Sequence, residues 1–245
     1  MSNERSELPE NAAEFAELND DVFGRIASRY DLLCDLFSFG IHRLWKRRVA
    51  QRIADEEWST LLDGATGTGD IILKLLPQIT KQNRHITAAD ISEKMLGVAQ
   101  QRFGVRANNV KLLKLDAERM SSIEDESIDA YSISLALKIC NRQLVLKEAL
   151  RVLRPGGRLI VLEASNIRWP FLQNAYLSYM SICMPLLGWL ATSGDASAYK
   201  YLLKGIREFP SAENLAIEMS NLGFENIEFE RLSLGIVAIH IARKP

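Results

Sequence analysis

The stretch that decides the fold is LLDGATGTGD, residues 61–70. Its apolar start and the acid Asp63 predict the end of a buried strand, and the glycines that follow predict a tight turn. The apolar residues after Asp70 predict a helix. A strand, a glycine-rich turn and a helix in this order are typical of α/β proteins that bind a nucleotide, because glycines let the backbone approach the ligand closely.

Three kinds of nucleotide site use such a turn, and the residues distinguish them. A phosphate-binding P-loop requires a lysine where Thr68 follows Gly67. A dinucleotide site requires a third glycine where Ile72 stands, and Asp70 at the start of the helix would repel a pyrophosphate. S-adenosylmethionine carries no phosphate, so it is the nucleotide that this turn fits best.

Strand-like and helix-like segments alternate after residue 58 and predict a doubly wound sheet. The expected strands are 61–65, 85–89, 110–115, 128–135, 158–162, 227–231 and 236–241. The expected helices are 69–76, ended by Pro77, then 92–103, 144–153 and 212–221, with a turn at 154–157. The predicted fold class is therefore α/β, with a mostly parallel, seven-stranded, Rossmann-like sheet.

Three further segments complete the predicted organisation around a methyltransferase domain of residues 58–245. Residues 1–20 are rich in Glu and Asn and predict a mobile acidic arm, and residues 21–57 predict a helical cap. An apolar, aromatic insertion at about 168–192 is interrupted by prolines and polar residues. A bilayer span needs ~20 apolar residues, so we expect the insertion to lie on a membrane surface, on the substrate or on a partner such as a second copy of the chain.

Ligands in such sheets bind beyond the carboxyl ends of the strands, where Asp63, Asp90, Asp116 and Glu163 stand. An acid that ends the second strand can accept hydrogen bonds from both ribose hydroxyls, a role that Asp90 fits. Asp116, after the third strand, can accept from the adenine amino group. We expect Asp63 and Asp70 near the cationic methionine end. The predicted cofactor site also includes Ala65, Thr66, Gly67, Gly69, Ile91, Met95, Ala117 and Ser134.

Composition argues against two classes of function. Lys and Arg number 30 against 31 Asp and Glu, and a net charge of −1 leaves no basic surplus for binding nucleic-acid phosphates. Cys34, Cys140 and Cys183 lie far apart, so no metal site is expected. An odd number of cysteines without a signal peptide indicates a reducing cytoplasm, with peripheral membrane contact if the insertion binds lipid.

Several sequence blocks resemble the ubiquinone/menaquinone biosynthesis C-methyltransferases (the UbiE family), which are class I S-adenosylmethionine-dependent enzymes. The blocks are VFGRIASRYDLLCDLFSFGIHRLWKRR (22–48), DISEKML (90–96), RVLRPGGRLIVLE (151–163), YKYLLKGIREFP (199–210) and GIVAIH (235–240). The resemblance implies methyl transfer from S-adenosylmethionine to a ring carbon of a demethylated polyprenyl quinol.

The chain departs from the family pattern mainly on the acceptor side. The family loop DLxGGTGD reads DGATGTGD here, with Thr66 in place of a glycine. After the fourth strand the family has FGxRN, whose Arg and Asn have been placed beside the quinol, whereas this chain has LALKIC at 135–140. Lys138 then replaces the Arg and Ile139 the Asn. Lys lacks the planar fork of Arg, and Ile cannot form a hydrogen bond.

A base that forms or stabilises a phenolate would make a quinol ring carbon nucleophilic. The predicted catalytic residues are Lys138, His42 and Tyr30. His42 lies in the basic run HRLWKRR and is expected to be partly solvated, while the run itself predicts a solvated helix face or a contact with anionic lipid. Tyr30 is expected either to cover the cofactor or to pack.

Five other polar residues are weaker candidates: Asp195, Tyr199, Tyr201, Arg207 and His240. At most one of the two tyrosines is expected to line the pocket, because they would face opposite ways in an extended segment. Arg207 is expected to pair with a carboxylate such as Glu163, and His240 to be a satisfied core histidine.

Two alternatives to a quinol enzyme stay open. One is a diverged methyltransferase of specialised metabolism that acts on another apolar acceptor, such as a prenyl diphosphate or an aromatic metabolite, and changes at 135–141 are what it predicts. The other is a non-catalytic scaffold that keeps the fold. Loss of Asp90 or of the glycines would favour a scaffold, and all are present.

Overall fold

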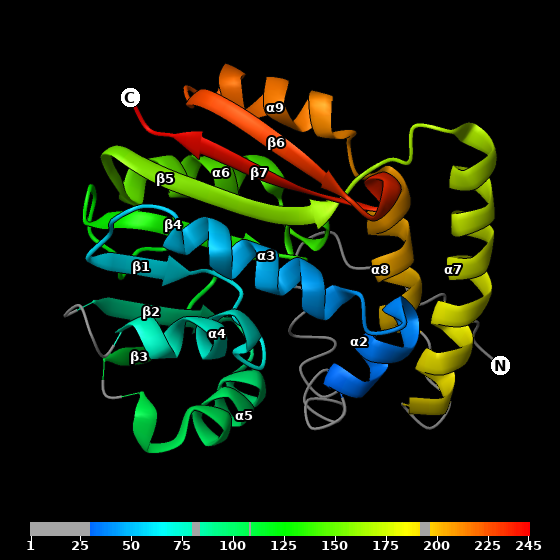
Figure 1. Ribbon diagram of the computed structural model, residues 1–245, viewed down its shortest axis with the longest axis horizontal. Helices are drawn as coiled ribbons and strands as arrows, with labels where there is room; N and C mark the ends of the chain where they lie inside the picture. Colours follow the sequence, from blue (N-terminus) through cyan, green and yellow to red (C-terminus); the bar gives the residue numbers. More distant parts are fainter. Residues whose placement is uncertain (1–29, 80–83, 108, 192–196) are drawn as a thin grey trace, which may run out of the picture.

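The computed structural model describes residues 30–79, 84–107, 109–191 and 197–245. Its centre is a seven-stranded sheet in the order β3-β2-β1-β4-β5-β7-β6, in which β7 runs antiparallel to both of its neighbours (Figure 1). The strands are β1 (Thr60–Asp63), β2 (His85–Asp90), β3 (Val110–Lys114), β4 (Ile128–Ser134), β5 (Leu153–Ala164), β6 (Glu225–Leu232) and β7 (Val237–Arg243). The predicted mostly parallel, seven-stranded α/β fold is confirmed.

Helices cover both faces of this sheet. The described helices are α2 (Tyr30–Ser38), α3 (His42–Ala54), α4 (Asp70–Ile79), α5 (Glu93–Phe103), α6 (Arg142–Val152), α7 (Pro170–Ala191), α8 (Ser197–Glu208) and α9 (Ala212–Asn221). Short 3-10 turns lie at Gly104–Arg106, Leu137–Ile139 and Ser233–Gly235. Helices α3, α4 and α5 share one buried cluster with the sheet, and α6 and α9 share the other.

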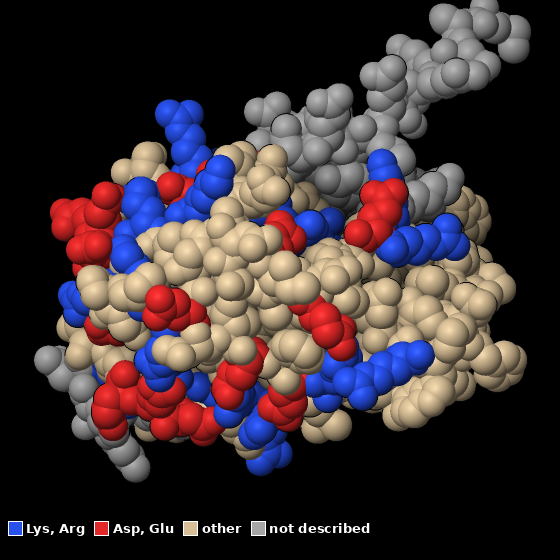
Figure 2. Space-filling model, turned by 90° about the horizontal axis from the view of Figure 1, so that it is seen from above, with Lys and Arg blue, Asp and Glu red and all other residues tan. Residues whose placement is uncertain are grey.

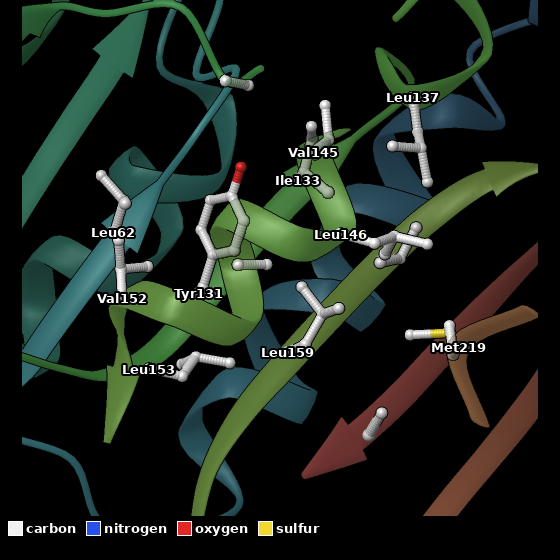
Figure 3. Packing of buried hydrophobic residues seen from close by; sticks show 14 of the residues in the cluster. Leu62, Tyr131, Ile133, Leu137, Val145, Leu146, Val152, Leu153, Leu159 and Met219 are labelled. Carbon is white, nitrogen blue, oxygen red and sulfur yellow. The ribbon is translucent and has the colours of Figure 1, made fainter. Parts of the chain in front are cut away.

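The cluster beneath α6 and α9 is centred on the side chain of Tyr131 in β4, which is fully buried (Figure 3). Its ring lies among aliphatic side chains from β1, β5 and α6, including Leu62, Val152 and Leu159. Gly64 is required at the end of β1, because a Cβ at this position would lie 2.3 Å from the Tyr131 hydroxyl oxygen. Packing of the core thus reaches directly to the glycine loop.

A third group of helices, α2, α7 and α8, lies beside the sheet rather than on either face (Figure 1). Leu33, Met180, Met184 and Leu203 form a small buried cluster of their own between these helices. The predicted insertion becomes the 22-residue helix α7, which begins at Pro170 and continues through Pro185. Proline suits a first helical position because its missing N–H has no partner there.

Cations fix one side of helix α3 to the sheet, whereas Arg43, Leu44 and Arg47 of the basic run HRLWKRR are exposed, so the predicted solvated face holds for part of the run and its contact with lipid stays a prediction. Arg48 donates to Glu230 of β6, with a distance of 2.9 Å between Nη2 and Oε2. The buried Arg158 of β5 donates to the carbonyls of Arg52 and Ile53, each at 3.2 Å. Carbonyls in the last turn of a helix lack internal partners, so Arg158 caps the carboxyl end of α3.

Two local predictions were wrong. Pro77 does not end its helix, because α4 runs to Ile79 although the proline removes the hydrogen bond that an N–H at this position would donate. Residues 154–157 do not form a separate turn, because β5 is continuous from Leu153. Gly156 takes a φ of 77° there, and its N–H donates to the carbonyl of Lys244. The predicted acidic arm 1–20, the start of the helical cap and Asp195 lie outside the described residues.

Two loop glycines offer a matched test of how the loop is packed. Gly67 has a φ of 55° with nothing within 4 Å of a Cβ placed there, whereas Gly69 has a φ of 84° and its Cβ would lie 2.4 Å from the buried Phe103 ring. We expect Gly67→Ala to lower the free energy of unfolding by only ~1 kcal/mol, the cost of a left-handed alanine. Gly69→Ala should cost at least ~2 kcal/mol more, because overpacking adds to it. Urea unfolding measures both, and equal losses would contradict the packing described.

Candidate active site

The carboxyl ends of the parallel strands bring the predicted acids to one edge of the sheet. Asp63 is the last residue of β1, Asp90 the last of β2, and Asp116 follows β3. Glu163 is the next-to-last residue of β5. Because β1 lies between β2 and β4, the glycine loop after β1 is at the centre of this edge. Ligands of such sheets bind where the strand order reverses, which here is between β1 and β4.

Asp90 organises the glycine loop. Its Oδ2 accepts from the N–H of Gly67 at 2.8 Å, and its Oδ1 accepts from the N–H of Ser92 at 2.9 Å. The N–H of Thr66 donates to the carbonyl of Ala89 at 2.9 Å, which ties the loop to β2 a second time. Burial raises the pKa of the Asp90 carboxyl, and these backbone hydrogen bonds oppose the rise.

The residues present fit S-adenosylmethionine. Each Asp90 oxygen accepts one N–H from the loops, so each keeps a lone pair for one of two neighbouring hydroxyls. The space beside Gly67 is open, since nothing lies within 4 Å of a Cβ built there. Ser134, at the end of β4, has a buried hydroxyl without a partner among the described residues. A diol acceptor, an open backbone and an unpaired hydroxyl suit a nucleoside with an amino-acid tail.

The other predicted cofactor residues lie along the same edge. Asp116 is half-buried, and its Oδ1 accepts from the N–H of Glu118 at 2.9 Å. Ala117 is buried beside it, Ile91 is half-buried directly after Asp90, and Met95 is buried in the first turn of α5. Their contacts with a cofactor stay predictions.

Asp63 is a buried acid with a raised pKa. Its side chain is 1 % exposed, and its Oδ1 accepts from the Ser132 hydroxyl at 2.7 Å. Burial raises the pKa of this carboxyl to about 6, although the hydrogen bond from Ser132 lowers it. A carboxyl with such a pKa can be held charged by a neighbouring cation, such as the ammonium of a bound amino acid.

Asp70 has cationic partners of its own. One oxygen accepts from Lys46 Nζ in α3 and the other from Arg102 Nη2 in α5, both at 2.7 Å. These two cations lower the pKa of the Asp70 carboxyl well below its usual value in spite of its burial. The carboxylate therefore joins three helices at the amino end of α4. Its predicted contact with the methionine end of the cofactor stays a prediction, now weakened by the neutralisation of its charge.

An apolar cavity of about 320 Å³ adjoins this edge, between the sheet and helices α2, α3, α7 and α8. Aromatic, aliphatic and methionine side chains supply most of its wall, including Phe37, Trp45, Tyr176, Tyr179 and Met180. Burial raises the pKa of the Tyr176 phenol to about 12, so this hydroxyl stays neutral. The wall suits an apolar ligand that carries few polar groups.

Lys138 and Glu163 form a buried ion pair in the wall of this cavity. The distance between Lys138 Nζ and Glu163 Oε1 is 3.1 Å, and the side chains are 7 % and 1 % exposed. Lys138 Nζ also donates to the carbonyl of Leu135, and Glu163 accepts from the backbone N–H groups of Lys138 and Ala164. The structure thus places the predicted residue Lys138 in the cavity, but with its charge already compensated.

His42 is buried, and the prediction that it is partly solvated was wrong. Its side chain is 3 % exposed and lines the cavity. Nδ1 lies 2.9 Å from the Ser38 hydroxyl and 3.7 Å from Asp35 Oδ1, while Nε2 has no partner among the described residues. Burial lowers the pKa of this imidazole. A neutral imidazole with a free nitrogen at an apolar cavity can accept a proton.

The remaining candidates are distributed differently. Tyr30 is the first residue of α2, and Tyr199 and Tyr201 lie in the helix α8 rather than in an extended segment, but their side chains lie outside the described set. Arg207 is exposed and donates to the Ser181 hydroxyl at 2.6 Å, so its expected pairing with Glu163 is wrong. His240 Nε2 lies 2.9 Å from the Ala212 carbonyl oxygen, which agrees with a core histidine.

Sequence reasoning missed the residues that hold the candidates in place. Ser38 and Asp35 contact His42 and precede it by four and seven residues. This spacing would place them on one face of a single helix, but a turn separates α2 from α3, so the sequence did not reveal the contact. Leu135 lines the cavity with a φ of 58°, an unusual conformation for leucine that no pattern reveals. Such strained backbone is common at functional sites.

The described part of the chain contains neither a metal site nor a membrane-spanning helix. It contains no group of three or more His, Cys, Asp or Glu side chains placed to hold a metal ion. In the same residues, no helix combines the length and apolarity that crossing a membrane would need.

Comparison with known proteins identifies relatives over nearly the whole chain. The model of the "ubiE/COQ5 methyltransferase family" matches residues 12–244. The Ubiquinone/menaquinone biosynthesis C-methyltransferase UbiE of Brucella anthropi is 38% identical over 229 residues, which cover 91% of this chain and 86% of the relative. The enzyme of the same name from Roseobacter denitrificans is 39% identical over 221 residues, covering 89% and 87%.

Solved structures share the fold at lower sequence identity. An S-adenosylmethionine-dependent methyltransferase of Thermotoga maritima, described as a possible histamine N-methyltransferase, has a TM-score of 0.64 at 22% identity, covering 92% of this chain and 99% of its own. The [4+2]-cyclase SpnF has a TM-score of 0.67 at 18% identity, covering 98% of both chains. At these identities, the likeness shows the fold alone.

The raised pKa of Asp63 predicts a pH-dependent effect on stability. The folded protein binds a proton at Asp63 below about pH 6, whereas the unfolded chain does so near 3.8. The contribution of this carboxyl to stability is thus full below pH 3.8 and is lost as the pH rises through 6. We expect Asp63→Asn, without ligand, to raise the free energy of unfolding at pH 8 by ~3 kcal/mol, and this gain should vanish near pH 4.

Urea unfolding at several pH values measures this effect. The exposed Glu124→Gln substitution removes a surface carboxyl and serves as the control, with little change expected at any pH. A difference between the Asp63→Asn protein and the original that stays constant from pH 4 to 8 would contradict the raised pKa.

Proposed function

Because this chain belongs to the ubiE/COQ5 methyltransferase family and is an S-adenosylmethionine-dependent methyltransferase, we propose that it methylates a ring carbon of an apolar, hydroxylated acceptor. A demethylated polyprenyl quinol is the first candidate, since the relatives from Brucella and Roseobacter are named for ubiquinone and menaquinone biosynthesis. The observation that carries the proposal is the apolar cavity beside the glycine-loop edge of the sheet.

The end of β4 joins the two parts of the proposed site. Ser134, with its unpaired hydroxyl, belongs to the proposed cofactor site, and the next residue, Leu135, lines the cavity. The left-handed backbone at Leu135 turns the chain at this point. An acceptor in the cavity would therefore lie next to the methionine end of the cofactor, as an in-line methyl transfer requires.

The protein contributes positioning and exclusion of water, while S-adenosylmethionine supplies an electrophilic methyl group when bound. Asp90 and Asp116 would hold the ribose and adenine, and Asp63 would face the methionine end. The wall formed by α2, α7 and α8 would keep water from the acceptor ring, which strengthens electrostatic interactions inside.

The outer surface near α7 suits an acceptor with a long apolar tail. Trp169, Phe171, Ile182, Leu186 and Trp189 are each more than half exposed along or next to this helix. Figure 2 shows largely uncharged surface at the end of the molecule where α7 lies. Contact of this face with a membrane, or with a second copy of the chain, is part of the proposal and would bring the enzyme to a lipid acceptor.

The Lys138–Glu163 pair favours a second candidate, a methyltransferase of specialised metabolism with a different aromatic acceptor. Lys138 and Ile139 stand where the family has Arg and Asn, and Ile139, directly after the cavity residue Lys138, packs an apolar side chain against the cluster between α2, α7 and α8 in place of an amide. A prenyl diphosphate fits less well. Among the described cavity residues Lys138 is the one Lys or Arg, and Glu163 already compensates its charge.

The first experiment measures transfer of a labelled methyl group from S-adenosylmethionine to candidate acceptors. A short-chain demethylmenaquinol, a hydroxylated aromatic without a tail and a prenyl diphosphate are tested in parallel. We expect label in the quinol and none in the diphosphate. Asp90→Ala should reduce incorporation to background, because it removes the proposed ribose acceptor. Label in the diphosphate alone, or in no acceptor, would contradict the proposal.

A double substitution tests whether the cavity has diverged from a quinol site. Lys138→Arg with Ile139→Asn restores both family residues, places an amide directly after the cavity residue 138 and lets residue 138 bind Glu163 through two N–H groups. We expect kcat/KM for the demethylmenaquinol to rise at least about tenfold, since one new hydrogen bond to an acceptor is worth ~1.4 kcal/mol. Lys138→Arg alone is the matched control. No gain in the double variant would favour the different aromatic acceptor.

A further inference from the structure

His42 lies where α2 and α3 meet, and one of its ring nitrogens is free at the cavity. The segment 39–41 turns the chain between the helices, with positive φ at Phe39 and Gly40. His42 is then the first residue of α3, and its ring is buried in the cavity wall. Nε2 is buried without a hydrogen-bond partner in the described part of the protein. A buried polar atom without a partner is costly, so a ligand atom is the natural partner for it.

The hydrogen bonds of Ser38 determine which nitrogen of His42 carries the proton. Ser38 Oγ lies 2.7 Å from the carbonyl oxygen of Cys34, which can only accept, so the single hydroxyl proton is used there. Ser38 Oγ also lies 2.9 Å from His42 Nδ1. Nδ1 must then donate to Ser38, because the hydroxyl has no second proton. The neutral ring is therefore protonated at Nδ1, and Nε2 of this cavity-lining residue keeps an unpaired lone pair.

The charged group nearest to the His42 ring lies at Nδ1, not at the unpaired nitrogen. Asp35 Oδ1 of α2 lies 3.7 Å from Nδ1, and it also accepts from Arg43 Nε at 2.7 Å. Lys46 on α3 and Asp70 on α4 act at longer range with opposite signs. Across the cavity stand Lys138 and Glu163, which compensate each other. Asp35 is therefore the carboxylate placed to stabilise a protonated ring.

We infer that His42 is the catalytic base of this site, and that its Nε2 accepts the proton of a ring hydroxyl of the acceptor. The inference rests on the proposed function and narrows the acceptor to a phenol or hydroquinone. Ser38 and Asp35 are positioning residues, because they hold the ring in the state with a free Nε2. Lys138 does not compete for this role, since its ammonium is held by Glu163 and by the Leu135 carbonyl.

In the proposed step, removal of a proton from the acceptor hydroxyl prepares the ring for methyl transfer. The hydroxyl proton moves to Nε2, and the electron pair left on oxygen raises the electron density at a ring carbon beside it. That carbon forms a bond to the methyl group, and the electrons of the broken carbon–sulfur bond stay on sulfur. The ring then loses the hydrogen of the methylated carbon to water and becomes aromatic again, while the oxygen regains a proton from the imidazolium. No oxidant or reductant is needed.

The first test observes the tautomer directly and needs no acceptor. The chain has three histidines, so the ring nitrogens of His42, His85 and His240 can be resolved by ¹⁵N nuclear magnetic resonance and assigned with His85→Gln and His240→Gln. We expect a protonated Nδ1 and a bare Nε2 for His42 at pH 7.5. In Ser38→Ala, a mixture of both tautomers should appear. A protonated Nε2 at pH 7.5 in the original protein would overturn the inference.

The second test uses kinetics with the hydroxylated acceptor that accepts label. His42→Gln keeps a polar side chain but removes the base, so we expect kcat to fall by at least ~10²-fold with the acceptor KM and S-adenosylmethionine Kd nearly unchanged. Burial lowers the pKa of His42, so kcat/KM of the original enzyme should fall below pH 6.5, where the ring becomes charged. This acidic limb should be absent in His42→Gln. The exposed His85→Gln is the matched control and should keep both rate and profile.

The outcomes separate this inference from the proposed function. If the original enzyme labels no hydroxylated ring, the proposed function fails, and with it the assignment of His42 as a base. If it labels one and His42→Gln keeps the rate and the acidic limb, the base assignment fails while the proposed function stands. If acceptors with more acidic hydroxyls lose less rate in His42→Gln than ordinary phenols do, proton removal at Nε2 is supported, and an equal loss for both would contradict it.

Discussion

The position of helix α3 is the constraint on which both parts of the site depend. Arg158 caps its carboxyl end, and the Arg48–Glu230 pair fixes it to β6. Lys46, in the middle of the helix, binds Asp70 at the start of α4, directly after the glycine loop. The first residue of the same helix, His42, lies in the wall of the cavity. One helix thus fixes the position of the apolar cavity relative to the glycine loop. The side chains of Lys46 and Asp70 are each 12 % exposed, so water screens their ion pair little.

The two parts of the site differ in how they use charge. Around the glycine loop, burial raises the pKa values of the Asp63 and Asp90 carboxyls, and hydrogen bonds from hydroxyl and backbone N–H groups offset the rise only in part. A cationic ligand would compensate this negative charge. In the cavity, Lys138 and Glu163 neutralise each other, and His42 is neutral. The molecule therefore combines an edge with uncompensated carboxyl groups and a cavity wall whose charged side chains are already paired.

Local sequence patterns predicted the sheet and its ligand-binding edge, because both follow from neighbouring residues. The glycines after Asp63 and the acids at or near the ends of β1, β2, β3 and β5 are signals within ten residues. The contacts that decide the acceptor side are not local. Lys46 meets Asp70 and Lys138 meets Glu163 across more than twenty residues, so the local pattern of the basic run did not separate its paired side from its exposed side. The burial of His42 in a cavity wall shared with α7 and α8 is likewise a long-range contact that no nearby residue indicates.

The small cluster of Leu33, Met180, Met184 and Leu203 supplies part of the wall of the apolar cavity. It is separate from the two large clusters that stabilise the sheet, so its side chains can change without loss of the main core. Its methionines are unbranched and adapt their shape to what they touch. Because this part of the cavity wall is packed separately, it can open locally while the sheet stays folded. Its side chains can also be exchanged to fit other ring compounds while the glycine-loop edge of the sheet is unchanged.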